Sequence, residues 1–150
     1  MTITKKEVYS ALHALLQEKQ KAIEANIDQL KQSAAEDTKS SAGDKYETGR
    51  EMVRQEIDKA VMMQQEYQVQ MDQLNGIDPE ERHEKVRVGS FVVTDRAAMF
   101  IAVGFGKIEV NGQVVFVISP QAPLARLMMN KAAGASLTFN GTPQQLVHVS

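Results

Sequence analysis

The sequence predicts an α+β protein: an N-terminal antiparallel helical hairpin (a coiled coil) followed by a small antiparallel β domain with one helix. Two patterns of apolar residues predict this fold. In the first half, apolar residues recur at alternating steps of three and four, the period of a coiled-coil seam. From Val86 onward the apolar period becomes two, which is typical of strands.

The first helix is predicted over residues 4–36. Thr4 followed by Glu7 fits a capping box, a signal for the start of a helix. The apolar stripe is interrupted only at Lys19-Gln20. The members of this stripe are Val8, Leu12, Leu16, Ile23, Ile27, Leu30 and Ala34.

The second helix is predicted over residues 45–74, and Asn75-Gly76 is a typical pair at a helix C-terminus. Gln64 falls on its apolar seam, where a polar residue is expected to fix the register of the two helices. The members of this second stripe are Val53, Ile57, Ala60, Gln64, Tyr67, Met71 and Leu74.

The two helices are separated by a short polar break, Ser40-Ser41-Ala42-Gly43-Asp44. Val8 lies as far before this break as Leu74 lies after it, so the chain is expected to fold back near Ser41-Ala42. The tip of the hairpin is therefore predicted at about residues 40–46. With roughly 30 residues per helix and a 1.5 Å rise, the arm is expected to be about 45 Å long.

The predicted domains are a helical hairpin over residues 1–76, a linker over residues 77–85 and a β domain over residues 86–150. Asn111-Gly112 between β-branched residues predicts a tight hairpin turn, and Asn140-Gly141 predicts another. The expected elements of this domain are strands near residues 86–93, 98–103, 107–110, 113–118, 136–139 and 144–149, with a helix over residues 123–131.

The composition excludes several classes of function. The chain has no cysteine, which rules out disulfides, zinc–thiolate sites and thiol nucleophiles. A formal charge of −2, from 17 basic and 19 acidic residues, gives no general electrostatic case for nucleic-acid binding. No run of about 18 apolar residues exists, so we expect a cytoplasmic protein with no membrane partner.

Three segments carry a resemblance to a known family. They are Gly43-Asp44-Lys45-Tyr46-Glu47, Val86-Arg87-Val88-Gly89-Ser90, and Ile118-Ser119-Pro120-Gln121-Ala122-Pro123-Leu124-Ala125-Arg126 with Lys131 and Gly134 behind it. In this order and spacing they resemble the tip, the start of the sheet domain and the strand-to-helix motif of Gre-family transcript-cleavage factors of bacterial RNA polymerase. The likeness extends over nearly the full chain and implies that the β domain is FKBP-like.

The chain departs from the family pattern at three places, so it resembles a divergent member. After Glu47 the family usually continues Asn-Ala-Glu-Tyr, whereas this chain has Thr48-Gly49-Arg50-Glu51. Ala122 stands where the strand-to-helix motif has a serine. The segment from Phe105 to Val117 lacks the family's acidic cluster and carries a hairpin instead.

The resemblance implies a transcription elongation factor that inserts its hairpin tip into the secondary channel of RNA polymerase. There Asp44 would help to hold a second Mg²⁺, and Glu47 would assist it or position the attacking water. Mg²⁺ prefers carboxylate oxygens and retained waters, and a second metal ion can activate water and stabilise the leaving oxygen. The ion would be held jointly with the polymerase, which performs the hydrolysis. The protein is therefore expected to be an accessory factor, not an enzyme, that contacts nascent RNA only indirectly.

The same pair of carboxylates also fits a purely structural role. Asp44 followed three residues later by Glu47 is itself a capping box, and acidic residues suit the positive end of a helix. The two roles are compatible, since a cap can be lost when a metal ion arrives.

The resemblance also implies contacts with the polymerase and its RNA. Lys45, Arg50 and Arg54 near the tip are weak candidates to contact RNA phosphates, and a solvated helix face paired with nearby carboxylates is the favoured interpretation. The residues implied in polymerase binding are Ser119, Pro120, Ala122 and Pro123.

Three other functions compete with transcript cleavage. Thr48-Gly49-Arg50 in the tip motivates a regulator that occupies the polymerase channel without cleaving RNA. An FKBP-like isomerase or chaperone would need an aromatic-lined hollow, but most of the five phenylalanines are expected in the core. The third competing function is that of a coiled-coil dimer. The matched lengths of the two arms instead favour pairing of the helices within one chain, and therefore a monomer.

Overall fold

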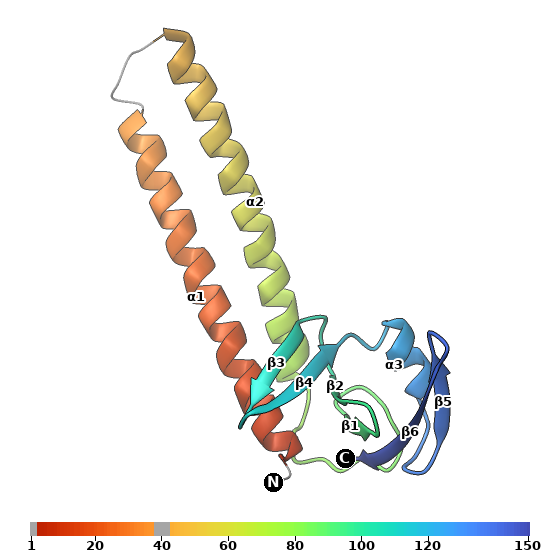
Figure 1. The fold of residues 1–150 in the computed structure, drawn as a ribbon. Coiled ribbons are helices and arrows are strands. Elements are labelled where there is room, and N and C mark those ends of the chain that lie inside the picture. Colours follow the sequence, from red (N-terminus) through yellow and green to blue (C-terminus); the bar gives the residue numbers. More distant parts are fainter. Residues whose placement is uncertain (1–2, 38–42) are drawn as a thin grey trace. The chain divides into compact units, whose positions relative to one another are not determined.

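The structure, a computed structural model, describes the backbone of residues 3–37 and 43–150 and the side chains of residues 3–36 and 49–150. It has the predicted α+β fold, with two long helices followed by a six-stranded sheet and one short helix (Figure 1). The chain divides into two compact units. The helical unit is Leu15–Val69, and the sheet unit joins the residues up to Ala14 with Gln70–Ser150.

The two long helices are α1 (Lys5–Asp37) and α2 (Gly43–Asn75), each of 33 residues. Their bounds agree with the prediction to within two residues. At the start of α1 the backbone N–H of Glu7 donates to Thr4 Oγ1 at 3.1 Å, which confirms the main bond of the predicted capping box. At the end of α2 the N–H of Gly76 donates to the carbonyl of Asp72 at 3.3 Å.

The predicted apolar stripes form the seam of an antiparallel helix pair. In the helical unit Ile23 and Ile27 of α1 form a buried cluster with Ala60 of α2. Their partly buried neighbours in this cluster are Leu30, Val61 and Tyr67. Every residue assigned to the two stripes from the sequence is buried or half-buried.

The gap in the first stripe coincides with a polar layer between the helices. Gln20 Nε2 donates to Gln68 Oε1 at 3.3 Å across the pair. Half-buried Gln64 lines the same cleft of about 340 Å³, together with Gln17 and Lys21. The polar break at Lys19-Gln20 therefore faces a second polar stretch on α2. The role of Gln64 in fixing the register stays a prediction.

The sheet has the strand order β3-β4-β2-β1-β6-β5. Its strands are β1 (Phe91–Thr94), β2 (Ala98–Ile101), β3 (Gly106–Val110), β4 (Gln113–Ile118), β5 (Ser136–Phe139) and β6 (Thr142–Val149). All neighbouring strands run antiparallel except β2 and β4, which pair in parallel, Ala98 opposite Val115 and Ile101 opposite Ile118. The sequence predicted a mostly antiparallel sheet, as observed, but did not indicate which strands would pair in parallel.

Both predicted Asn-Gly turns are present. Asn111 and Gly112 have φ values of 50° and 80°, and Asn140 and Gly141 have φ values of 51° and 76°. Two consecutive residues with positive φ are what a tight hairpin turn of the primed type requires, and asparagine followed by glycine tolerates this best. These turns set the register of β3 with β4 and of β5 with β6.

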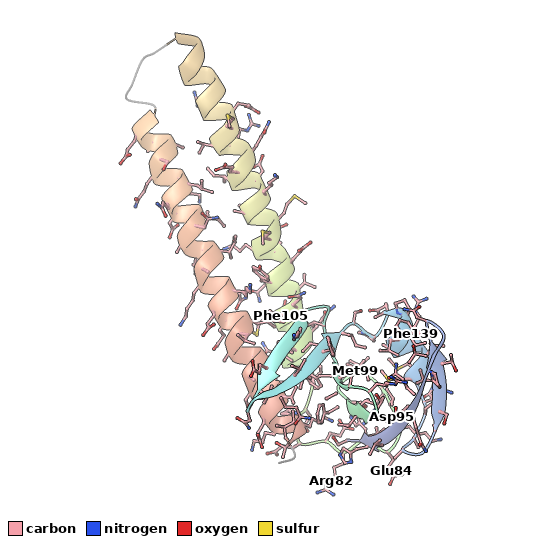
Figure 2. The ribbon with its side chains drawn as sticks, viewed as in Figure 1. Arg82, Glu84, Asp95, Met99, Phe105 and Phe139 are labelled. Carbon is pink, nitrogen blue, oxygen red and sulfur yellow. The ribbon has the colours of Figure 1, made fainter. Side chains whose placement is uncertain are left out.

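The helix α3 (Pro123–Met128) covers one face of the sheet. It ends three residues before the predicted end, because Met129 leaves the helical region at ψ 135° and Asn130 has a φ of 65°. Met99 lies in the middle of this core and Phe139 at its margin (Figure 2). The buried members of the core are Val86, Val92, Met99, Ile101, Ala125, Met128, Leu137 and Leu146.

Within the sheet unit, the first turns of α1 and the last turns of α2 are bonded to each other and to the sheet. Tyr9 Oη donates to the carbonyl of Leu74 at 3.1 Å. Gln70 Nε2 donates to the carbonyl of Gly104 at 3.2 Å, and the side chain of Asn111 is bonded to that of Glu7. The helix ends near the linker are thus part of the same compact body as the sheet.

Candidate functional site

The predicted metal ligands Asp44 and Glu47 lie in the first turns of α2, which begins at Gly43. The predicted capping box places Asp44 at the N-cap, immediately before the helix. In the structure the backbone of Asp44 is already helical. The side chains of Asp44, Glu47 and the neighbouring Lys45 lie outside the part of the chain that the structure describes. Their roles toward Mg²⁺ and RNA therefore stay predictions.

The two arginines behind the predicted tip lie one turn apart on the exposed surface of α2. Arg54 Nη1 lies 4.0 Å from Glu51 Oε2, and both side chains are well exposed. A pair this long and this exposed contributes little to stability. Arg50 and Arg54 are therefore positioned as a solvated basic surface, which is compatible with both interpretations of these residues from the sequence.

The predicted polymerase-binding residues form the connection between β4 and α3. Ser119 Oγ accepts from the backbone N–H of Gln121 at 3.1 Å, and the N–H of Ala122 donates to the carbonyl of Ser119 at 3.0 Å. Ala122 is the N-cap of α3 and provides no side-chain cap, while Pro123 occupies the first turn of the helix. The structure thus brings all four predicted residues, Ser119, Pro120, Ala122 and Pro123, into one tight turn at the surface.

An apolar patch that the sequence did not reveal leads into this turn. Val114 and Phe116, which we call the β4 patch, are 38% and 42% exposed. They alternate with the buried Val115 and Val117, so they share a sheet face with Ile118, which packs at the margin of the α3 core. Phe116 is thus an exception to the prediction that most phenylalanines are core residues. Every residue from Val114 to Ile118 is apolar, so period-two alternation gave no signal for the exposed side.

A buried polar cluster joins the linker to the sheet. His83 Nδ1 lies 2.7 Å from Ser90 Oγ, which also accepts the backbone N–H of Arg87 at 2.9 Å. Because Ser90 is fully buried, we assign its hydroxyl proton to His83 Nδ1, which leaves the histidine proton on Nε2. Burial lowers the pKa of His83, and the charges of Lys5 and Arg87 lower it further against the opposing effect of Glu81.

Lys5, at the start of α1, is the second buried ionisable residue of this cluster. It is 6% exposed, and its Nζ donates to the backbone carbonyl of Glu81 at 2.7 Å. Burial lowers the pKa of Lys5, and the nearby carboxylate of Glu81 opposes that effect. The sequence gave no indication of this pair, because Lys5 and His83 lie in segments that read as charged and exposed.

The segment Val86–Ser90, one of the three that carry the family resemblance, forms the other side of this cluster. Val86 is fully buried and its N–H donates to the carbonyl of Lys131 at 2.9 Å. Gly89 has a φ of 91°, and a Cβ placed there would lie 3.1 Å from Ile77 Cγ2 and 3.5 Å from His83 Cε1. A glycine at this position is thus needed both for its backbone conformation and for close packing of the linker.

The residues that the structure describes contain no group of three or more histidine, aspartate or glutamate side chains that could hold a metal ion. In the same residues, no helix is both long and apolar enough to cross a membrane. A comparison with protein-family models finds no match, and a comparison with curated proteins finds none either.

Proposed function

We propose that this protein is a Gre-like transcription elongation factor that stimulates cleavage of backtracked RNA by bacterial RNA polymerase. The observation that carries the proposal is the placement of Asp44 and Glu47. They stand in the first turns of α2, directly after the connection between two paired antiparallel helices. Acidic residues where the second helix of such a pair begins would suit delivery into a narrow channel.

The chemistry assigned to Asp44 and Glu47 requires few groups from the protein itself. Asp44 would complete the coordination of a weakly held second Mg²⁺ in the polymerase, and Glu47 would assist it or orient water. The protein would act as an accessory factor and a cytoplasmic monomer, and the polymerase would provide the other metal ligands. The intrachain pairing of α1 with α2 supports the monomer, because it buries the apolar seam that a dimer would need.

The surface of the sheet unit supports a docking role. The turn from Ser119 to Pro123 is exposed or half-exposed, and the β4 patch of Val114 and Phe116 leads directly into it. Exposed aromatic residues next to a polar turn are typical of the centre of a protein–protein interface. We propose that this surface holds the protein on the polymerase, with the docking strength supplied by the β4 patch.

Affinity capture and RNA cleavage together test the proposal. The tagged full chain is expected to retain core RNA polymerase from lysate, and to shorten the RNA of a purified backtracked complex in the presence of Mg²⁺. Polymerase that is neither retained nor stimulated to cleave RNA would contradict the proposal.

A second candidate is a channel regulator that does not cleave RNA. Gly49, within the family-divergent stretch Thr48-Gly49-Arg50, lies inside α2 with nothing within 4 Å of a Cβ placed there. Glycine weakens a helix interior, so the helix just behind the tip differs physically from one that continues with alanine. Polymerase binding with reduced nucleotide addition and no RNA shortening would favour this candidate.

The alternative of a prolyl isomerase receives no support from the clefts of the sheet unit. The two that we describe, of about 920 and 390 Å³, are lined by neither phenylalanine nor tyrosine. Phe91 and Phe100, the most buried phenylalanines, are core residues. A prolyl isomerisation assay on a model peptide is expected to show no acceleration.

A further inference from the structure

The sheet unit contains a cleft of about 920 Å³ that the proposed polymerase function does not use. It lies between the start of α1, the linker, the loop before β5 and the end of β6. Lys5 and His83 line it as buried polar residues, and Ile3, Pro79, Ala132 and Ala133 supply an apolar lining. A concave, partly apolar site with a few buried polar groups has the general character of a small-molecule site.

Lys5 places a buried positive charge in the wall of this cleft. Of the carboxylates that line it, Glu80 is paired with Lys6 at 3.1 Å and Glu81 is paired with Arg87. Among the residues that the structure describes, no carboxylate lies within 4.0 Å of Lys5 Nζ. The buried ammonium is satisfied only in part, by the backbone carbonyl of Glu81.

A buried ammonium with no carboxylate in direct contact is unfavourable, although the nearby Glu81 offsets part of the penalty. An incoming negative group in the same low-dielectric space would lower that penalty further. Arg82 and Glu84 both line the cleft, and both side chains project outward from the linker (Figure 2). The lining contains as many cationic side chains as carboxylates, but only one of these six charged groups, Lys5, is buried.

We propose that this cleft binds a small molecule with a carboxylate or phosphate group, held by the ammonium of Lys5. The apolar residues Ile3, Pro79, Ala132 and Ala133 would accommodate a short apolar body attached to that group. The site lies in the linker and sheet and shares no residue with the predicted tip or docking turn. The proposed ligand site can therefore be tested independently of the polymerase function.

Thermal unfolding of the full chain at constant ionic strength tests the proposal with named probes. Sodium hexanoate and inorganic phosphate represent the two oxyanions, and hexanamide is the neutral analogue of hexanoate. At least one oxyanion is expected to raise the melting temperature in a saturable manner, while hexanamide has no effect. A response to hexanoate alone assigns a carboxylate ligand, and a response to phosphate alone assigns a phosphate ligand.

Two charge-removing variants provide the matched comparison. Lys5→Gln is expected to weaken the apparent affinity by about tenfold or more, the amount expected for a hydrogen bond to a charged group. Lys59→Gln removes one positive charge from the exposed surface of α2 and is expected to respond like the unchanged chain. Equal responses of the Lys5 variant and the unchanged chain would overturn the proposal, as would the absence of saturation with either oxyanion.

A measurement on the unchanged chain keeps the test decisive if Lys5→Gln does not fold. Nuclear magnetic resonance of the lysine Cε groups reports on the Lys5 ammonium directly. Titration with the active oxyanion is expected to shift the Lys5 signal and to raise its pKa, because an adjacent anion favours the charged form. A Lys5 signal that stays unchanged while the probe is added would overturn the proposal.

Discussion

His83 Nδ1 and Ser90 Oγ lie 2.7 Å apart in the interior of the sheet unit and connect the linker to the residue before β1. Both side chains are buried, and Ser90 also binds the backbone of Arg87. Burial and the positive charges of Lys5 and Arg87 lower the pKa of His83 and favour a neutral imidazole, against the opposing carboxylate of Glu81. Protonation of His83 is thus opposed by burial and by its neighbours.

This arrangement predicts a loss of stability on acidification. The pKa of His83 is lower in the folded chain than the ordinary value of 6.5, so the unfolded chain binds more protons below that pH. The free energy of unfolding is expected to be insensitive to His83 above pH 6.5 and to fall as the pH drops from 6.5 toward the folded pKa. Urea unfolding at pH 8.0, 6.5 and 5.5 measures the effect.

His83→Gln is expected to flatten this pH dependence, even though it removes a buried bond and lowers stability at every pH. His13→Gln, a change of the same type at a half-buried residue of α1, serves as the control for the loss of a histidine side chain. If the His83 variant lost stability on acidification as steeply as the unchanged chain, the assignment of a neutral buried His83 would be wrong.

The position of Gly89 beside the same cluster leads to a second prediction. Gly89→Ala is expected to lower the free energy of unfolding by about 2–4 kcal/mol, because it combines left-handed strain with crowding. The crowding is against Ile77 Cγ2, 3.1 Å from the added Cβ. Gly141→Ala, with a φ of 76° and nothing within 4 Å, adds strain alone. Its expected loss is about 1–2 kcal/mol, so equal losses in denaturant unfolding would show that the contact with Ile77 is unimportant.

Replacing Gly49 with alanine is expected to raise the free energy of unfolding, whereas the same change at Gly89 lowers it. Gly49→Ala adds a methyl group to the interior of α2 where nothing lies within 4 Å. Alanine loses less backbone entropy than glycine in a helix, so the variant is expected to be about 0.5–1 kcal/mol more stable. Circular dichroism of urea unfolding measures the change, and a variant that is less stable than the unchanged chain would contradict the helical environment of Gly49.

The β4 patch is expected to contribute to polymerase binding beyond its modest contribution to stability. Phe116→Ser removes a side chain that is 42% exposed, so the free energy of unfolding is expected to fall by about 1–2 kcal/mol through the lost burial. Its affinity for RNA polymerase, measured by surface binding, is expected to fall by about tenfold or more, as for an aromatic residue at the centre of an interface.

Val147→Ser provides the matched comparison for this patch. Val147 is 61% exposed on β6, away from the turn between β4 and α3. Its substitution is expected to leave the affinity for polymerase unchanged. Equal affinities of the Phe116 and Val147 variants would remove the β4 patch from the docking surface.

The sequence predicted the helices and the hairpin turns well because their signals are local. The seam period located both stripes, and each predicted stripe residue, from Val8 to Leu74, is buried or half-buried. The turns at Asn111-Gly112 and Asn140-Gly141 were predicted because few other residue pairs tolerate positive φ twice in succession. The parallel pairing of β2 with β4 depends on contacts distant in the sequence, which local patterns do not encode.

The site residues were predictable to different degrees for the same reason. A motif located the turn from Ser119 to Pro123, and the structure brings these residues together at the surface. Phe116 escaped prediction because its strand is apolar on both faces. The cluster of Lys5 with His83 escaped because it forms only when segments 78 positions apart meet, and neither segment carries an apolar pattern that indicates burial.

The most direct test of the central claim is the rate of RNA cleavage in a backtracked elongation complex with the unchanged chain, Asp44→Asn or Asp58→Asn. Asp58 is an exposed carboxylate of α2 outside the predicted tip, so its variant controls for charge. We predict that the unchanged chain and the Asp58 variant accelerate Mg²⁺-dependent cleavage equally, and that the Asp44 variant loses about tenfold or more of the acceleration. Full acceleration by the Asp44 variant, or none by the unchanged chain, would contradict the account.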